Sequence, residues 1–296
     1  MTDLAQALRE VIVRVEAQLQ QKIDELQLLD PRLKEAMTYG VLNGGKRLRP
    51  FLIYATCKAL GGGKAQADSA AVAMEMVHSY SLVHDDLPAM DDDDLRRGKP
   101  TCHIAFDEAT AILAGDGLLT AAFEVLAKAQ EHSLTTRLKL IELLAKNAGG
   151  AGMVAGQCID LNHVGKSMTL PELEAMHGHK TGALITASVL MGAYCAKEAL
   201  NPSELSALTA YAQHLGLAFQ VWDDVLDVQG DTATLGKSQG KDEASNKPTY
   251  PALLGLDGAR QLARKLVENA QNALQEVRAD TDELSALAAY VISRDH

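Results

Sequence analysis

The chain has 296 residues, of which 47% are hydrophobic and only 4% aromatic, and its formal net charge is −11 at pH 7. Such an acidic chain is a poor candidate for binding nucleic acid, which depends on clustered Lys and Arg against phosphates. Runs of β-branched and aromatic residues are nearly absent, so we expect an all-α protein. Length alone would allow two domains of about 150 residues, but no linker or repeat is visible. We therefore expect one domain over residues 1–296.

The four cysteines, at positions 57, 102, 158 and 195, form no CxxC pair. This spacing argues against a disulfide framework and against a zinc site. We expect ordinary buried thiols in a reducing compartment. We expect the mixed-charge N-terminal segment to form an amphipathic helix rather than a signal peptide. The uncharged run of residues 181–196 is shorter than the ~20 residues that span a bilayer. We expect a cytoplasmic protein without stable membrane insertion.

Apolar residues recur at helical spacing along most of the chain, and no stretch alternates with period two. We expect helices over residues 3–28, 32–42, 46–60, 65–84, 104–113, 116–131, 135–147, 150–163, 171–177, 180–196, 202–227 and 257–277. Pro88 ends the fourth of these, because the residue before a proline avoids the helical region. Residues 229–251 form the one long irregular segment, and loops of this length in compact domains are mostly functional or disordered.

Six aspartates and two arginines lie between residues 85 and 97. Asp85 and Asp86 close a helix, where carboxylates are unfavourable unless positive charge compensates them. Asp91 follows at a fixed short spacing, and hard divalent cations such as Mg²⁺ prefer carboxylate oxygens. Taken alone, this stretch fits a solvated acidic loop and a metal site equally well.

A second acidic cluster lies in the helical segment 202–227. Gln220, Asp223 and Asp227 share one face of this helix, and Asp224 adjoins them. Like charges one turn apart repel each other unless they meet cations. The aspartates could pair with lysines of a neighbouring helix, or they could bind metal ions.

Two acidic clusters suggest two faces of one cavity with metal ions between them, a typical arrangement for binding phosphate or diphosphate. The segment from Gly40 to Lys46 nearly matches a P-loop, but Arg47 replaces its Ser/Thr and no strand precedes it. We reject a nucleotide-binding loop, so Arg and Lys side chains must complete the phosphate site.

The motifs occur in a specific order. Gly44-Gly45-Lys46-Arg47-Leu48-Arg49-Pro50 comes first, followed by Asp85-Asp86-Leu87-Pro88-Ala89-Met90-Asp91 with Arg96-Arg97, then Gly156-Gln157 with Asp160, Lys180-Thr181 and Asp223-Asp224-Val225-Leu226-Asp227. From about residue 43 to 251, this order resembles the trans-isoprenyl diphosphate synthase family, most closely its bacterial members that form farnesyl diphosphate.

The resemblance implies a helical bundle around a deep central cavity, a homodimer, and three Mg²⁺ ions per active site, with Mn²⁺ as a possible substitute. The implied metal ligands are Asp85, Asp91 and Asp223. The implied reaction condenses isopentenyl diphosphate with dimethylallyl or geranyl diphosphate, through ionisation to an allylic cation, condensation and deprotonation. The residues implied in catalysis are Asp85, Asp86, Asp91, Arg96, Lys180, Asp223 and Asp224, with Asp227 in support.

Two groups of residues are implied in substrate binding. The allylic diphosphate would contact Arg96, Lys180, Thr181, Gln220, Lys237 and Lys247. Isopentenyl diphosphate would contact Lys46, Arg49, His78 and Arg97. Without the motif, we would interpret Lys46 and Arg49 as surface charges and His78 as a core histidine.

Product length is expected to depend on Tyr80 and Ser81, which lie about a turn before Asp85 on the same helix. A bulky Tyr80 resembles the floor of enzymes that stop at C15, whereas a small residue would suggest C20. The alternative is that Tyr80 is only a packed core aromatic.

Several rival functions remain. A geranylgeranyl diphosphate synthase would share the fold. A Mg²⁺-dependent terpene cyclase would not need the second diphosphate-binding group. A phosphohydrolase would need an activated water, and His84 is the only obvious base beside the aspartates. A regulatory subunit would be expected to lose one acidic motif, and a calcium module fails on ligand spacing.

Overall fold

The computed structural model describes residues 3–229 and 248–294. The all-α expectation is confirmed, since the only strands in this part of the chain form a two-residue hairpin, β1 (Leu95–Arg96) with β2 (Lys99–Pro100). The helices are α1 (Leu4–Glu25), α2 (Pro31–Val41), α3 (Leu48–Ala59), α4 (Lys64–Asp85), α5 (Cys102–Ala105), α6 (Glu108–Ala127), α7 (Leu134–Ala148), α8 (Met153–Asn162), α9 (Leu170–His177), η1 (Gly178–Gly182), α10 (Ala183–Ala196), α11 (Pro202–Gln229), α14 (Tyr250–Leu274) and α15 (Asp282–Val291).

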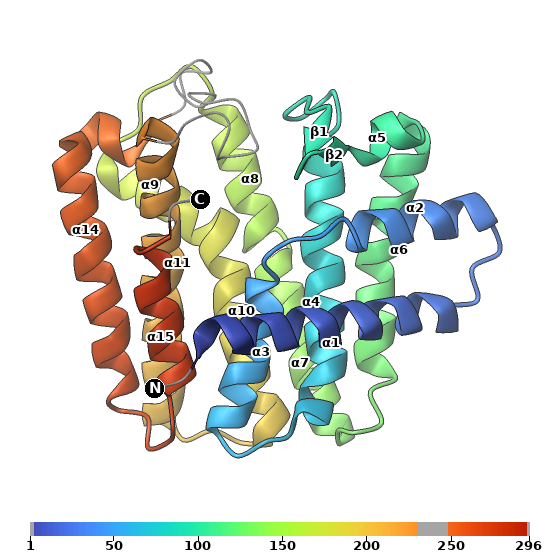
Figure 1. The fold of residues 1–296 in the computed structure, drawn as a ribbon, viewed down its shortest axis with the longest axis horizontal. Helices are drawn as coiled ribbons and strands as arrows, with labels where there is room; N and C mark the ends of the chain where they lie inside the picture. Colours follow the sequence, from blue (N-terminus) through green and yellow to red (C-terminus); the bar gives the residue numbers. More distant parts are fainter. Residues whose placement is uncertain (1–2, 230–247, 295–296) are drawn as a thin grey trace.

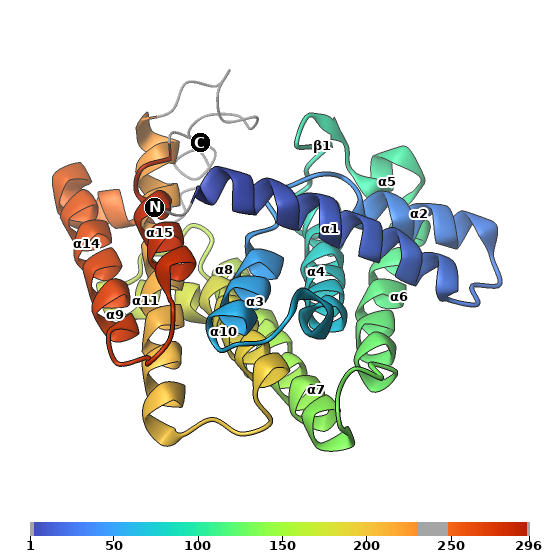
Figure 2. The same ribbon diagram turned by 60° about the horizontal axis from the view of Figure 1, so that its bottom comes forward.

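The helices pack around one continuous apolar core. Helix α4 lies between α6 and α3, α10 packs on α3, α4 and α7, and α11 packs on α10 and α14. Figure 1 shows α1 crossing in front of α3 and α4, and Figure 2 shows the same helices from below. Every residue of α4 from Ala70 to Val77 is buried, which makes α4 a central helix of the bundle.

Helices α4 and α11 carry the two acidic motifs near their C-terminal ends. Both helices run upward in Figure 1, so both motifs lie toward the same end of the bundle. The bundle therefore brings together two segments that are more than one hundred residues apart in the sequence.

Several sequence predictions about the elements are wrong. Residues 108–127 form one helix, not two, and Gly115 lies inside it against His84: a Cβ at Gly115 would lie 2.1 Å from Nε2 of His84. Helix α14 begins at Tyr250, inside the segment expected to be irregular, and it kinks at Gly255, where φ is +70°. Helix α15 was not predicted.

The prediction of four buried cysteines is wrong for Cys158, which is exposed.

By length and composition, α6 is the one helix of the described residues that could cross a membrane. Core helices pass the same test, and α6 packs against α4 and α2.

Candidate active site

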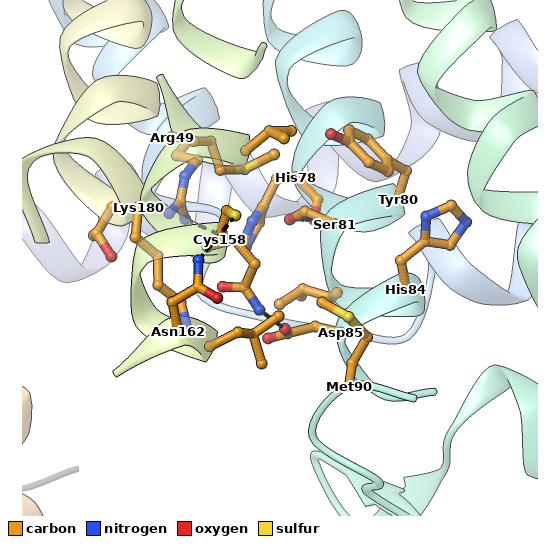
Figure 3. Close-up of a pocket in the computed structure, with 16 residues that line it drawn as sticks. Arg49, His78, Tyr80, Ser81, His84, Asp85, Met90, Cys158, Asn162 and Lys180 are labelled. Atoms are coloured by element: carbon orange, nitrogen blue, oxygen red, sulfur yellow. Dashed lines mark hydrogen bonds between the residues drawn. The ribbon is translucent and has the colours of Figure 1, made fainter. Parts of the chain in front are cut away.

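A cavity of about 460 Å³ lies between α4, α8 and η1. Figure 3 shows Arg49, His78, Asp85 and Lys180 around it, with Tyr80 at one side. The expected site residues that line it are Arg49, His78, Tyr80, Ser81, Asp85, Lys180 and Thr181. The remaining lining is largely apolar and includes Met90, Met153, Val154 and Leu161. His78 and Tyr80 both line this cavity, and Tyr80 is also part of the buried core.

The first acidic motif is fixed by a turn after α4. The backbone N–H of Asp91 donates to the Asp85 carbonyl at 2.9 Å, which closes this turn at the end of the helix. From α8, Gln157 Nε2 donates a hydrogen bond to Asp85 Oδ1. Gln157 belongs to a motif noted in the sequence, but its contact with Asp85 was not predicted.

Asp86 is buried, with 3% of its surface exposed, and it binds Arg96. Arg96 Nε lies 2.8 Å from Asp86 Oδ2 and Nη2 lies 2.6 Å from Oδ1, a bidentate arrangement. Burial alone would lower the pKa of Arg96, but its hydrogen bonds with Asp86 and the negative charge raise it. Arg96, expected to contact a diphosphate directly, is thus held by an aspartate of the first motif.

The cationic segment before α3 folds against the segment after the first acidic motif. Gly45 has φ +123°, and a Cβ there would lie 2.6 Å from the Arg97 guanidinium, so only glycine fits. Arg97 Nη1 donates to the Gly44 carbonyl. Burial lowers the pKa of Lys46, and the charge of Arg294 lowers it further. This contact gathers Lys46, Arg49 and Arg97, three of the four expected isopentenyl diphosphate ligands.

His78 lies beside this cationic group. Its Nε2 lies 3.3 Å from Arg49 Nη1, and the ring lines the cavity. Burial, followed by the charges of Arg49, Arg97, Arg96 and Arg47, lowers the pKa of His78 well below its usual value. The imidazole is therefore neutral near pH 7.

Lys180 and Thr181 lie in η1, one turn of π-helix that α8 approaches closely. A Cβ at Gly156 would lie 2.1 Å from the Lys180 backbone nitrogen. Lys180 Nζ lies 2.6 Å from Asp160 Oδ2, and Thr181 Oγ1 donates to Gln220 Oε1 at 2.9 Å. π-Helical turns often occur at functional sites.

The second acidic motif is anchored from two sides. Asp224 is buried, and its Oδ2 accepts the backbone N–H of Tyr250 at 3.0 Å. Asp223 accepts a hydrogen bond from Arg294, whose guanidinium lies 4.0 Å from the centre of the Phe219 ring. The sequence did not predict a role for Arg294. Lys237 and Lys247 lie outside the described residues.

The donor set fits Mg²⁺ ions that phosphate oxygens help to hold. In residues 3–229 and 248–294, no group of three or more His, Cys, Asp or Glu side chains is placed to hold a metal by itself. Mg²⁺ is commonly bound by one or two carboxylates together with water and substrate phosphates. Carboxylates of the two acidic motifs match this pattern better than they match a preformed protein cage.

Comparisons with known proteins identify the family of this chain. The polyprenyl synthetase family model matches residues 30–287. The chain is 50% identical to a farnesyl diphosphate synthase of Escherichia coli, covering 99% of both chains. It is 46% identical to a chloroplastic geranylgeranyl pyrophosphate synthase of Catharanthus roseus, over 90% of this chain and 74% of the relative. A putative farnesyl-diphosphate synthase structure from Marinomonas superposes with TM-score 0.84 and 43% identity, covering 99% of this chain and 100% of that one.

The fold, the site and these matches place the chain in the polyprenyl synthetase family. The resemblance seen in the sequence motifs is thereby confirmed. A prenyltransferase activity follows from membership of this family.

Proposed function

We propose that this chain condenses isopentenyl diphosphate with dimethylallyl diphosphate and then with geranyl diphosphate to form farnesyl diphosphate. The cavity beside Asp85 carries this proposal, because it joins Lys180 and Asp85 to an apolar lining. One end suits a diphosphate, and the lining suits a hydrocarbon chain. The names of the bacterial relatives support the C15 product.

Asp85, Asp91 and Asp223 would hold Mg²⁺, which supplies positive charge that stabilises a leaving diphosphate. Lys180 and Arg96 bind oxygens of the allylic diphosphate, and Lys237 and Lys247 are assigned the same role from the sequence. As the C–O bond breaks, negative charge grows on the diphosphate, and these cations stabilise it. Asp160 and Asp86 hold Lys180 and Arg96 in place.

An allylic cation needs dipoles near it and no water. Gln220 faces it with its side-chain amide, and the hydrogen bond from Thr181 fixes the orientation of that amide. The apolar lining residues Met90 and Met153 exclude water from the hydrocarbon part of the cavity.

Lys46, Arg49, His78 and Arg97 bind isopentenyl diphosphate. The double bond of this substrate attacks the allylic cation, a new C–C bond forms, and a proton is then lost to the released diphosphate. A neutral His78 donates or accepts one hydrogen bond without adding charge. A terpene cyclase has no second diphosphate to bind, so this second cationic group favours a condensing enzyme.

A geranylgeranyl diphosphate synthase is the second candidate, because a relative of that name is 46% identical. Tyr80 is the residue that discriminates the two. It lines the cavity, only 7% of it is exposed, and its ring lies 5.7 Å from His84 in an edge-on arrangement. A fixed aromatic ring at this position favours a C15 product.

We also propose a homodimer in the cytoplasm. Helices α6 and α7 expose apolar side chains that a second copy would cover, namely Ile112, Leu113, Leu134 and Leu138. Light scattering on the purified protein tests this, and a monomeric mass would contradict it.

The assignment of the two diphosphates is tested by steady-state kinetics. Lys180→Ala should raise KM for geranyl diphosphate or lower kcat, with little change in KM for isopentenyl diphosphate. Arg97→Ala should raise KM for isopentenyl diphosphate, with little change in KM for geranyl diphosphate. Lys139→Ala, a substitution of an α7 lysine outside this cavity, is the control and should change neither constant. Equal effects of both site variants on both substrates would contradict the assignment.

A further inference from the structure

Glu75 is a buried carboxylate among the cations of the candidate isopentenyl diphosphate site. It lies on α4, three residues before His78, and its side chain is only 2% exposed. Its Oε1 lies 2.5 Å from Nη1 of Arg47, whose side chain is 1% exposed. Neither residue lines the cavity, and neither is used in the mechanism above. A buried ion pair of this kind requires an explanation, because removing two charges from water is costly.

Arg47 forms the turn between Lys46 and Arg49. Its φ is +49°, a left-handed conformation that is unfavourable for a residue with a side chain. Besides Glu75, its guanidinium donates to the Val41 carbonyl at 2.6 Å and to Glu16 Oε1 at 3.1 Å. These contacts hold the turn, and the turn sets the direction of the two flanking cations.

The carboxylate of Glu75 also affects the arginines Arg49 and Arg97. Glu75 Oε2 is buried without a hydrogen-bond partner, and so is Nε of Arg49. The negative charge of Glu75 raises the pKa of Arg49 and of Arg97, against the lowering caused by their burial. The charge of Glu75 therefore acts on both Arg49 and Arg97, and Glu75 and Arg49 each keep one buried polar atom without a hydrogen-bond partner.

We propose that Glu75 is a positioning residue for isopentenyl diphosphate. It anchors Arg47, and its charge balances Arg49 and Arg97 so that these guanidiniums stay gathered before a diphosphate binds. Without this anion, repulsion within the cluster and a loosened turn would displace Lys46 and Arg49. The inference rests on the proposed assignment of the isopentenyl diphosphate ligands.

Glu75→Gln tests the role, because it keeps the shape and removes the charge. We expect KM for isopentenyl diphosphate to rise about tenfold, with KM for geranyl diphosphate and kcat changed less than about twofold. The control is Glu204→Gln, which removes another buried carboxylate, paired with Lys197 at 2.8 Å, outside the cavity. This control should leave all three constants unchanged. An unchanged KM in Glu75→Gln would overturn the inference.

Loss of stability is separated from loss of positioning by a second variant. Removing one partner of a buried pair is strongly destabilising, whereas replacing both partners with hydrophobic residues of similar volume is often nearly neutral. The double variant Arg47→Met with Glu75→Met should therefore recover the melting temperature while KM for isopentenyl diphosphate stays high. If the melting temperature and KM for isopentenyl diphosphate both return to their wild-type values, Glu75 is only part of a structural pair and the proposal is wrong.

Calorimetric titration with isopentenyl diphosphate separates failure of the inference from failure of the proposed function. Wild-type protein that binds this ligand without turnover would contradict the function, and weaker binding by Glu75→Gln would still support the positioning role. Equal binding by wild type and Glu75→Gln would overturn the positioning role, whatever the turnover.

Discussion

Lys180 and Asp160 form an ion pair of 2.6 Å between the π-helical turn η1 and helix α8. Asp160 is buried, whereas Lys180 is partly exposed and lines the cavity. The carboxylate therefore fixes the direction of the cation that is proposed to bind the allylic diphosphate.

Replacing Asp160 should impair the allylic step. Asp160→Asn should lower kcat/KM for geranyl diphosphate about tenfold, because Lys180 loses its charged partner. Lys180→Ala should lower it by about 10²–10³-fold, the usual effect of removing a group that stabilises developing charge. Steady-state kinetics with each substrate varied in turn measure both. Full activity of Asp160→Asn would show that Lys180 needs no anchor.

The close approach of α8 to η1 predicts a second effect. Gly156→Ala should lower both the melting temperature and kcat/KM, because its Cβ would meet the backbone of Lys180. Gly178→Ala is a matched control in η1 itself, where a Cβ would meet no atom within 4 Å. Thermal unfolding and the condensation assay compare the two. Equal behaviour of the two variants would refute this account of the packing.

Tyr80 is expected to limit the product. Tyr80→Ala should move the main product from C15 to C20, because the cavity beside Ser81 becomes deeper. Chromatography of the dephosphorylated products measures the chain length. Tyr194→Ala, a substitution outside this cavity, should leave the product at C15. A C15 product from Tyr80→Ala would show that Tyr80 does not limit the chain length.

His177 should make stability fall in acid. Burial lowers its pKa to about 4 from an ordinary value of 6.5, so the unfolded chain binds a proton that the folded protein does not. The associated stability is present above pH 6.5 and is lost as the pH falls towards 4. Its Nδ1 has no hydrogen-bond partner, and its ring lies 5.4 Å from that of Tyr250.

His177→Phe keeps a ring beside Tyr250 and cannot be protonated. Between pH 7 and pH 4.5 it should lose about 2–3 kcal/mol less unfolding free energy than the wild type. Urea unfolding at both pH values measures the difference. His179→Gln, in which an exposed side chain is replaced, should behave like the wild type. Equal acid losses in wild type and His177→Phe would contradict this account.

Much of the fold could be predicted because its helices are long and periodic. The prediction failed where distant contacts decide the local structure. Gly115 looks like a helix break, but it packs under His84 within α6. Tyr250 starts a helix that Thr249 caps through its side chain, which accepts the Ala252 N–H, and this local signal was overlooked. Asp224, 26 residues earlier, also accepts the backbone N–H of Tyr250.

The site could likewise be predicted where local motifs define it, but not where distant contacts do. Motif order identified Asp85 and Lys180, the family resemblance implied His78, and the cavity brings these residues together. The partners that hold site residues could not be predicted, because contacts such as Arg294 with Asp223 join residues far apart in the chain. Glu75 carried a readable signal, since a charged residue within the apolar run of α4 needs a buried partner.

The central claim is a metal-assisted condensation that ends at C15. The most direct measurement incubates purified protein with labelled isopentenyl diphosphate and geranyl diphosphate, with and without Mg²⁺, and determines the product length. The account predicts a C15 alcohol after dephosphorylation, formed only when Mg²⁺ is present. No condensation under either condition would contradict it, and a C20 product would retain the mechanism but overturn the role of Tyr80.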